Sequence, residues 1–156
     1  MTGLNDKILN LIESGLPVIS LKSDHSEIII NSFTEISRST GKAVYVWDEV
    51  DGLYRIDARH IPIPRTQEIE HLLKHLGRNK HYGIYVLKDI KRHLTSTYLW
   101  QLFAEAIAAT ADNDSMILLL GQEIQLPDSM KSLIAQIWRA RKQSAKPATS
   151  SVKEAI

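Results

Sequence analysis

Short apolar runs alternate with longer amphipathic stretches along this chain. Four runs are rich in β-branched, aromatic or leucine residues and lack a strict apolar–polar alternation: residues 17–21 (PVISL), 43–47 (AVYVW), 82–87 (YGIYVL) and 116–120 (MILLL). Strands that are covered on both faces have this pattern, as in a parallel sheet flanked by helices. A fifth run, residues 133–138 (LIAQIW), fits either a strand or the continuation of a helix.

The stretches between these runs have helical periodicity, and four helices are expected, opening near Leu4, Asp24, Thr66 and Thr95 or Ser96. Asp24 and Glu27 can form a capping box, and Thr66 can cap the third helix. Glycines stand where the first three helices would end, at Gly15, Gly41 and Gly77. This order predicts a doubly wound α/β domain, with a mostly parallel sheet, right-handed crossovers and helices on both faces.

Two segments depart from the pattern. Residues 48–65 form a long connection that Pro62 and Pro64 keep extended near its end, and it could hold a small hairpin or an excursion over the sheet. The residues that follow Arg139 include few large apolar side chains. We therefore expect a single α/β domain over residues 1–140 and a flexible C-terminal tail over residues 141–156.

Composition narrows the class of protein. The 156 residues include 19 Lys and Arg against 18 Asp and Glu, so the net charge of +1 gives no broad field to attract nucleic acid. The absence of cysteine excludes disulfides, thiolate metal sites and a cysteine nucleophile. No apolar run approaches the length of about 20 residues that spans a bilayer, and the N-terminus does not resemble a signal peptide. We expect a cytoplasmic protein without a membrane partner.

Ligands of open α/β sheets bind beyond the C-terminal ends of the strands, so the turns there supply the candidate ligand-binding residues. The first turn contains Lys22, Ser23, Asp24 and His25. A P-loop would need glycines at this turn, whose backbone N–H groups close around the phosphates. The turn has no glycine, and Asp24 puts a carboxylate at the positive end of the next helix, where it would repel a phosphate. Nucleotide binding by a backbone cradle is therefore not expected.

The second strand ends in an acidic turn. Asp48, Glu49 and Asp51 could hold a divalent cation, but their spacing matches no complete calcium loop. An acidic turn in which Gly52 supplies the special backbone conformation is the favoured interpretation.

The third and fourth runs also end in candidate ligand-binding residues. Asp89 stands where P-loop ATPases carry the acid that holds Mg²⁺, but Ile90 follows it instead of a base for the attacking water. Gln122 stands where such ATPases carry a polar γ-phosphate sensor. We expect no catalytic residue, no metal and no cofactor from these positions.

Exposed aromatic and basic residues are candidates for an interaction surface. Trp100 lies off the apolar stripe of the fourth helix, and Lys91 and Arg92 lie in a basic cluster near it in sequence. Four other aromatic residues are further candidates for docking, although most of them fit the core better: Tyr45, Trp47, Tyr54 and Trp138. A second basic cluster in the tail leaves nucleic-acid binding as the weakest alternative.

The segments PVISLKSDHSE, VYVWDEVDGL, IYVLKDI and ILLLGQEIQLP occur in this order between residues 4 and 138. With them the chain resembles the N-terminal, degenerate ATPase-like domain of a family of bacterial and plastid AAA-type ATPases. The resemblance implies a five-stranded core like that of P-loop ATPases without the P-loop, with residues 133–138 as the fifth strand. It also implies that Asp89 and Gln122 are relics of the metal-binding acid and the sensor, and that ATP hydrolysis belongs to a module that these 156 residues lack.

These observations favour a non-catalytic interaction or regulatory domain, whose protein partner would be an AAA-type ATPase or a second copy of the chain. The alternative is a domain that binds a small molecule or nucleotide in the crevice at the strand ends. That alternative requires the fold to bring Asp24, His25, Asp48, Asp89 and Gln122 together.

Overall fold

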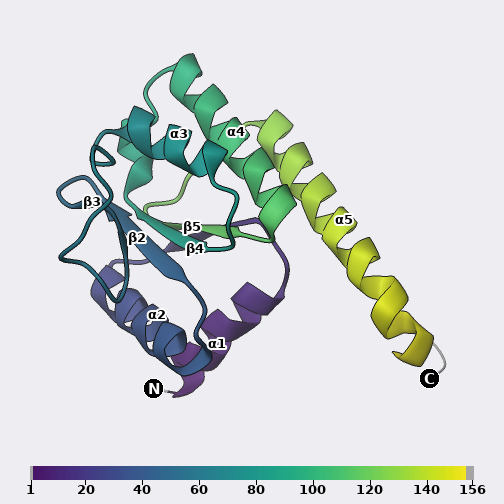
Figure 1. Cartoon of the computed structure of the whole chain (residues 1–156). Helices are drawn as coiled ribbons and strands as arrows, with labels where there is room; N and C mark the ends of the chain where they lie inside the picture. Colours follow the sequence, from purple (N-terminus) through teal and green to yellow (C-terminus); the bar gives the residue numbers. More distant parts are fainter. Residues whose placement is uncertain (1, 154–156) are drawn as a thin grey trace.

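The computed structural model describes the backbone of residues 2–153 and the side chains of residues 3–143. Its centre is a five-stranded sheet in the order β1-β5-β4-β2-β3 (Figure 1). Four strands are parallel, and the edge strand β3 is antiparallel to β2. Their bounds are β1 (Val18–Lys22), β2 (Val44–Asp48), β3 (Gly52–Arg55), β4 (Ile84–Lys88) and β5 (Met116–Gly121). The expected α/β class and mostly parallel sheet are confirmed.

Helices cover both faces of the sheet (Figure 1). One face carries α1 (Thr2–Glu13) and α2 (Ser26–Thr40), and the other carries α3 (Ile69–Arg78), α4 (Thr97–Asn113) and α5 (Asp128–Lys153). Neighbouring residues of one strand enter different cores: Val86 is buried on the α1/α2 side and Leu87 on the opposite side. Because both faces are covered, the central strands need apolar residues at every position, which explains the unbroken apolar runs.

The expectation that residues 133–138 form the fifth strand is wrong, because they lie within helix α5. Leu133, Ile134 and Ile137 recur at helical spacing and pack against the core on the α3/α4 side of the sheet. The fifth strand is instead β3, inside the long connection that follows β2. From its pattern alone, the run at residues 133–138 fitted either a strand or a helix, and the resemblance favoured the strand. The connection over residues 48–65 was expected to hold either a hairpin or an excursion.

The long connection contains the small hairpin that was one of its two expected forms. Gly52 has φ +79° at the turn between β2 and β3, as the acidic-turn interpretation requires. After β3 the chain folds back along the outer edge of this strand, where the Ile63 N–H donates to the Leu53 oxygen at 2.8 Å. This loop therefore covers one edge of the sheet.

Two of the expected helix caps differ in the structure. Thr66 does not cap α3, which begins after Glu68. Instead Thr66 is buried, and its Oγ1 accepts from the Leu53 N–H and donates to the Ile63 oxygen, both at 2.7 Å. The hydroxyl is consumed in joining the loop to the edge of β3, so it is not available to a helix end.

The capping box of Asp24 and Glu27 is also absent. Helix α2 begins after His25, and no side chain hydrogen-bonds to its first turn. By contrast, Ser96 caps α4 as expected, because its hydroxyl accepts from the Leu99 N–H at 3.2 Å. Gly41 takes the expected left-handed conformation at the end of α2, with φ +75°.

Helix α5 continues beyond residue 140 as far as Lys153, and residues 154–156 lie outside the described part. Arg141 contacts the domain directly, as described below. A flexible tail over residues 141–156 stays a prediction. Within residues 2–153, none of the helices combines the length and the apolarity that crossing a membrane requires.

Candidate functional site

The expected ligand-binding residues share one edge of the sheet. Because strands β1, β5, β4 and β2 are parallel, their C-terminal ends meet there in this order. Lys22 is in register with Gly121 and Lys88 with Leu120, so the turns that carry Ser23, Gln122 and Asp89 follow neighbouring strands. The C-terminal ends of the parallel strands thus carry the predicted residues in one row, with Asp48 of β2 at the end of the row that lies farthest from β1.

The crevice between β1 and β5 is the topological switch point of this sheet. The chain leaves β1 toward α2 on one face and leaves β5 toward α5 on the other, and ligands of open α/β sheets bind where such connections diverge. Here the Ser23 N–H donates to the Gly121 oxygen at 3.1 Å, which continues the strand ladder past the end of β1. The Ser23 N–H is therefore already paired and is not free to bind a ligand.

The turn from β1 to α2 is held by its own hydrogen bonds. Only residues 23–25 separate strand and helix, and the Ser23 hydroxyl accepts from the His25 N–H at 3.0 Å. Asp24 and His25 are exposed. The turn presents an acidic side chain to solvent and does not have the glycine-rich loop that would wrap a phosphate.

Asp89 occupies the centre of the edge in an uncommon backbone conformation. Its φ is +53°, and its N–H donates to the Leu120 oxygen at 2.9 Å. Its carboxylate lies directly against Gly121, because a Cβ placed on that glycine would collide with Asp89 Oδ1. A hollow of about 290 Å³ opens beside it, lined by Asp89, Lys91, Arg92 and Gln122. The structure therefore brings Asp89 and Gln122 together with two basic residues.

A charge cluster that the sequence reading did not assemble lies beside this hollow. Glu49, from the turn after β2, forms an ion pair with Arg92, and its Oε1 lies 3.0 Å from His93 Nε2. The hydrogen bond from Arg92 lowers the pKa of Glu49 below its usual value. The His93 ring in turn meets the buried Trp47 edge-on, with centroids 5.3 Å apart. The sequence shows that oppositely charged residues follow β2 and β4, but it does not show that these strands are neighbours, so the pairing was missed.

Asp48 does not join the other predicted ligands. Its Oδ1 accepts from the Val50 N–H at 2.9 Å and the Asp51 N–H at 2.7 Å, so this carboxylate holds the hairpin turn. Among the described residues, no group of three or more histidine, aspartate or glutamate side chains could hold a metal ion. The five residues that the crevice alternative needs are thus not brought to one point.

The expected interaction residues are unequally exposed. Trp100 is half-buried against the core, with its ring 6.1 Å from that of Phe103, whereas Lys91 and Arg92 are exposed. Tyr98 is the more exposed aromatic residue of α4, and its hydroxyl donates to Glu70. Two of the other aromatic candidates, Trp47 and Tyr54, are buried in the core.

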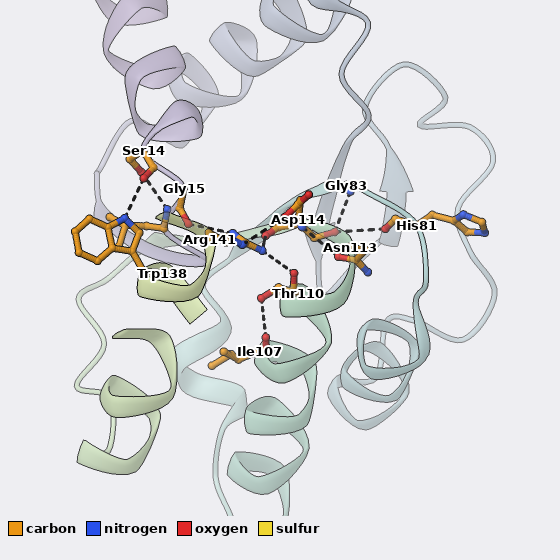
Figure 2. Close-up of polar contacts among 12 residues, drawn as sticks. Ser14, Gly15, His81, Gly83, Ile107, Thr110, Asn113, Asp114, Trp138 and Arg141 are labelled. Carbon is orange, nitrogen blue, oxygen red and sulfur yellow. Dashed lines mark hydrogen bonds and ion pairs between the residues drawn. The ribbon is translucent and has the colours of Figure 1, made fainter. Parts of the chain in front are cut away.

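A larger hollow of about 580 Å³ opens at the opposite edge of the sheet, near the N-terminal ends of the strands. Arg141 of α5 lines it and donates to the backbone oxygens of Gly15, Thr110 and Ser115 at 3.1, 2.6 and 2.8 Å (Figure 2). Trp138, one turn earlier, donates to the Ser14 oxygen at 3.0 Å. The guanidinium attaches α5 to the α1–β1 turn, to the last turn of α4 and to the residue before β5, and this attachment was missed because residues 133–138 were expected to be a strand.

One comparison with known proteins identified a family. A family model described as SpoVK-like AAA ATPase, N-terminal domain, matches residues 4–138. The chain belongs to this family. Searches of the curated proteins and of the solved structures found no match.

The residues matched by the SpoVK-like AAA ATPase N-terminal domain family, 4–138, include all five strands and the turns at both ends of them. The match confirms the expected resemblance. Arg141 lies just beyond the matched residues, so its contacts are features of this chain that the family match does not describe.

Proposed function

We propose that this domain is a non-catalytic interaction or regulatory module of the AAA-type ATPase family, and that it does not bind ATP at the strand ends. The observation that carries the proposal is the turn after β1, at the switch point. The Ser23 N–H is paired with Gly121, the turn around it lacks glycine, and Asp24 adds a negative charge. A triphosphate would meet no free backbone cradle there and would be repelled by the carboxylate.

The arrangement around Asp89 supports the same proposal. A carboxylate that holds Mg²⁺ through water needs free oxygen atoms facing the nucleotide. Here Asp89 Oδ1 packs against Gly121, and Ile90, a buried apolar residue, occupies the position after it. We place the domain in the cytoplasm as part of the proposal, with an AAA-type ATPase or a second copy as its protein partner.

Calorimetric titration with Mg-ATP tests the proposal. We expect no saturable heat up to millimolar nucleotide, whereas a dissociation constant in the micromolar range would correspond to about −8 kcal/mol and would contradict it. Lys22→Ala is the diagnostic variant, because Lys22, the last residue of β1, is the lysine that adjoins the first turn. Binding that this variant abolishes would assign the nucleotide to the switch point, and binding that it leaves intact would assign it elsewhere.

The hollow beside Asp89 favours one second candidate function, the binding of a small molecule that presents both an anionic group and a hydrogen-bond donor. Lys91 would pair with the anion, and Asp89 or Gln122 would accept the hydrogen bond. Arg92 is already paired with Glu49. Thermal-shift screening with metabolites of this kind, repeated on Asp89→Ala, tests this candidate. Stabilisation that the variant abolishes, with unchanged protein–protein association, would favour it over the interaction module.

A further inference from the structure

The two edges of the sheet are treated differently. At the β3 edge, the loop before α3 uses the Ile63 N–H and the Thr66 hydroxyl to pair with both backbone groups of Leu53. At the other edge, β1 has β5 as a neighbour on one side only. An open edge strand is a template for pairing with another chain, and natural proteins usually cover or interrupt it.

The backbone groups on the free side of β1 can be identified from its pairing with β5. The Pro17 oxygen accepts from the Ile117 N–H, and the Ser23 N–H donates to the Gly121 oxygen. In a parallel ladder only alternate residues face a given neighbour, so the backbone groups of residues 18, 20 and 22 face away from β5. Among residues 2–153, no other segment donates to or accepts from these groups.

The side chains of β1 show that the edge is accessible. Ser20 and Lys22 are exposed, and Ile19 and Leu21 are only half-buried. Ile19 and Leu21 extend the α1/α2 core to the end of the sheet, where this apolar layer stops at solvent. A partner strand that continued the sheet would also continue this layer.

We infer that β1 is a self-association surface, on which β1 of a second copy of this chain pairs in antiparallel orientation about a two-fold axis at Ser20. This inference deepens the proposed function, since it specifies the surface and partner of the interaction module. In this register Ile19 of one copy lies opposite Leu21 of the other, so each apolar side chain meets an apolar one. Lys22 lies opposite Val18.

The charges on β1 favour this register over a parallel one. Lys22 is the only charged residue of the strand, and in-register parallel pairing would put the two lysines side by side. Like charges in neighbouring positions of a sheet are destabilising. Two-fold antiparallel pairing separates the lysines to opposite ends of the ribbon and lets every outward N–H of residues 18, 20 and 22 reach a carbonyl. A two-fold axis also closes the assembly as a dimer.

Sedimentation equilibrium of the full chain with a matched pair of variants tests the surface. Ser20→Pro removes one outward N–H and leaves the ladder to β5 intact, whereas Ser20→Thr keeps the N–H. We expect a dimer for the unaltered chain and for Ser20→Thr, and a dissociation constant at least about tenfold weaker for Ser20→Pro. Circular dichroism must show that Ser20→Pro is folded; if it is not, the cysteine variants below decide the result.

The absence of cysteine in the chain allows a direct test of the register. Directly opposed residues of a hydrogen-bonded antiparallel pair have Cα atoms about 5.5 Å apart, within the span of a disulfide. Under mild oxidation Ser20→Cys should form a disulfide-linked dimer rapidly, whereas Ser39→Cys, exposed on α2, should remain monomeric on denaturing gels.

Equal cross-linking of the two cysteine variants, or a chain that is monomeric at every concentration, would overturn the inference. The proposed function has a separate readout. A monomer that also fails to bind Mg-ATP contradicts only the β1 pairing, and a β1-linked dimer that binds Mg-ATP at Lys22 contradicts only the proposed function.

Discussion

Replacing Arg141 with methionine should weaken the attachment of helix α5 to the α1–β1 turn and to the segment between α4 and β5. The substitution keeps an unbranched apolar stem and removes the guanidinium that donates to three backbone oxygens. The Arg141 side chain is 14% exposed, and burial lowers its pKa. Folding therefore removes much of the hydration free energy of the charged guanidinium. The net effect of the substitution depends on which of these contributions is larger.

The three hydrogen bonds from a charged donor would contribute about 1.5–3 kcal/mol each, or roughly 4.5–9 kcal/mol together. Desolvation of the buried guanidinium opposes this by several kcal/mol, which leaves a net loss of about 2–4 kcal/mol for Arg141→Met. For a chain of this size the melting midpoint would fall by about 5–15 °C. Arg141→Lys should be intermediate, because one ammonium cannot reach all three oxygens together.

Urea and thermal unfolding followed by circular dichroism measure this loss. Lys142→Met is the matched control, since Lys142 is exposed and its ammonium only lies over the Trp138 ring, 4.8 Å from the centroid. It should cost no more than about 1 kcal/mol. A chain that ends at residue 140 should be no more stable than Arg141→Met. An Arg141→Met midpoint equal to that of the unaltered chain would refute the reasoning.

Three further substitutions have defined outcomes. Burial raises the pKa of Tyr85, so the folded state keeps its phenol neutral and should lose stability as the pH rises above about 10, where the unfolded chain ionises; Tyr85→Phe should flatten this alkaline loss in urea titrations. The lowered pKa of Glu49 gives stability that is present above about pH 4.5 and lost as the pH falls. The free energy of unfolding of Glu49→Gln should therefore be lower than that of the unaltered chain at pH 7, and the two values should converge near pH 3. Gly121→Ala should lower the melting temperature more than Gly41→Ala, because both glycines have positive φ but only at Gly121 would the new Cβ meet a carboxylate, that of Asp89; equal losses would show that this contact is unimportant.

Much of the fold was predictable because the strands are covered on both faces. Burial on two sides demands unbroken apolar runs, and the four parallel strands were found from those runs alone. The edge strand β3 was not found as a strand, because an edge next to a loop needs no such run. The segment 133–138 was assigned to the wrong element on the strength of the resemblance, although its apolar spacing was compatible with a helix.

The candidate site was predictable only in part, because strand order decides which turns meet. The turn after β1 was correctly read as lacking a glycine cradle. The prediction of a capping carboxylate at Asp24 failed, because the Ser23 hydroxyl and the chain itself close that turn. The pairing of Glu49 with Arg92 depends on β2 and β4 being neighbours, which no local pattern states. The role of Arg141 depends on three carbonyl groups from separate segments.

The attachment of α5 to the α1–β1 turn also constrains the order in which the chain folds. Trp138 and the Ser14 oxygen that it contacts are separated by 124 residues. In the same way, β1 pairs with β5, which is the last strand of the sheet along the chain. Closing a loop of this length costs more entropy than forming the local hairpin of β2 and β3. During synthesis on the ribosome, β1 must therefore wait for its partner until β5 has emerged, so the strand of this sheet that is made first is among the last to be fixed.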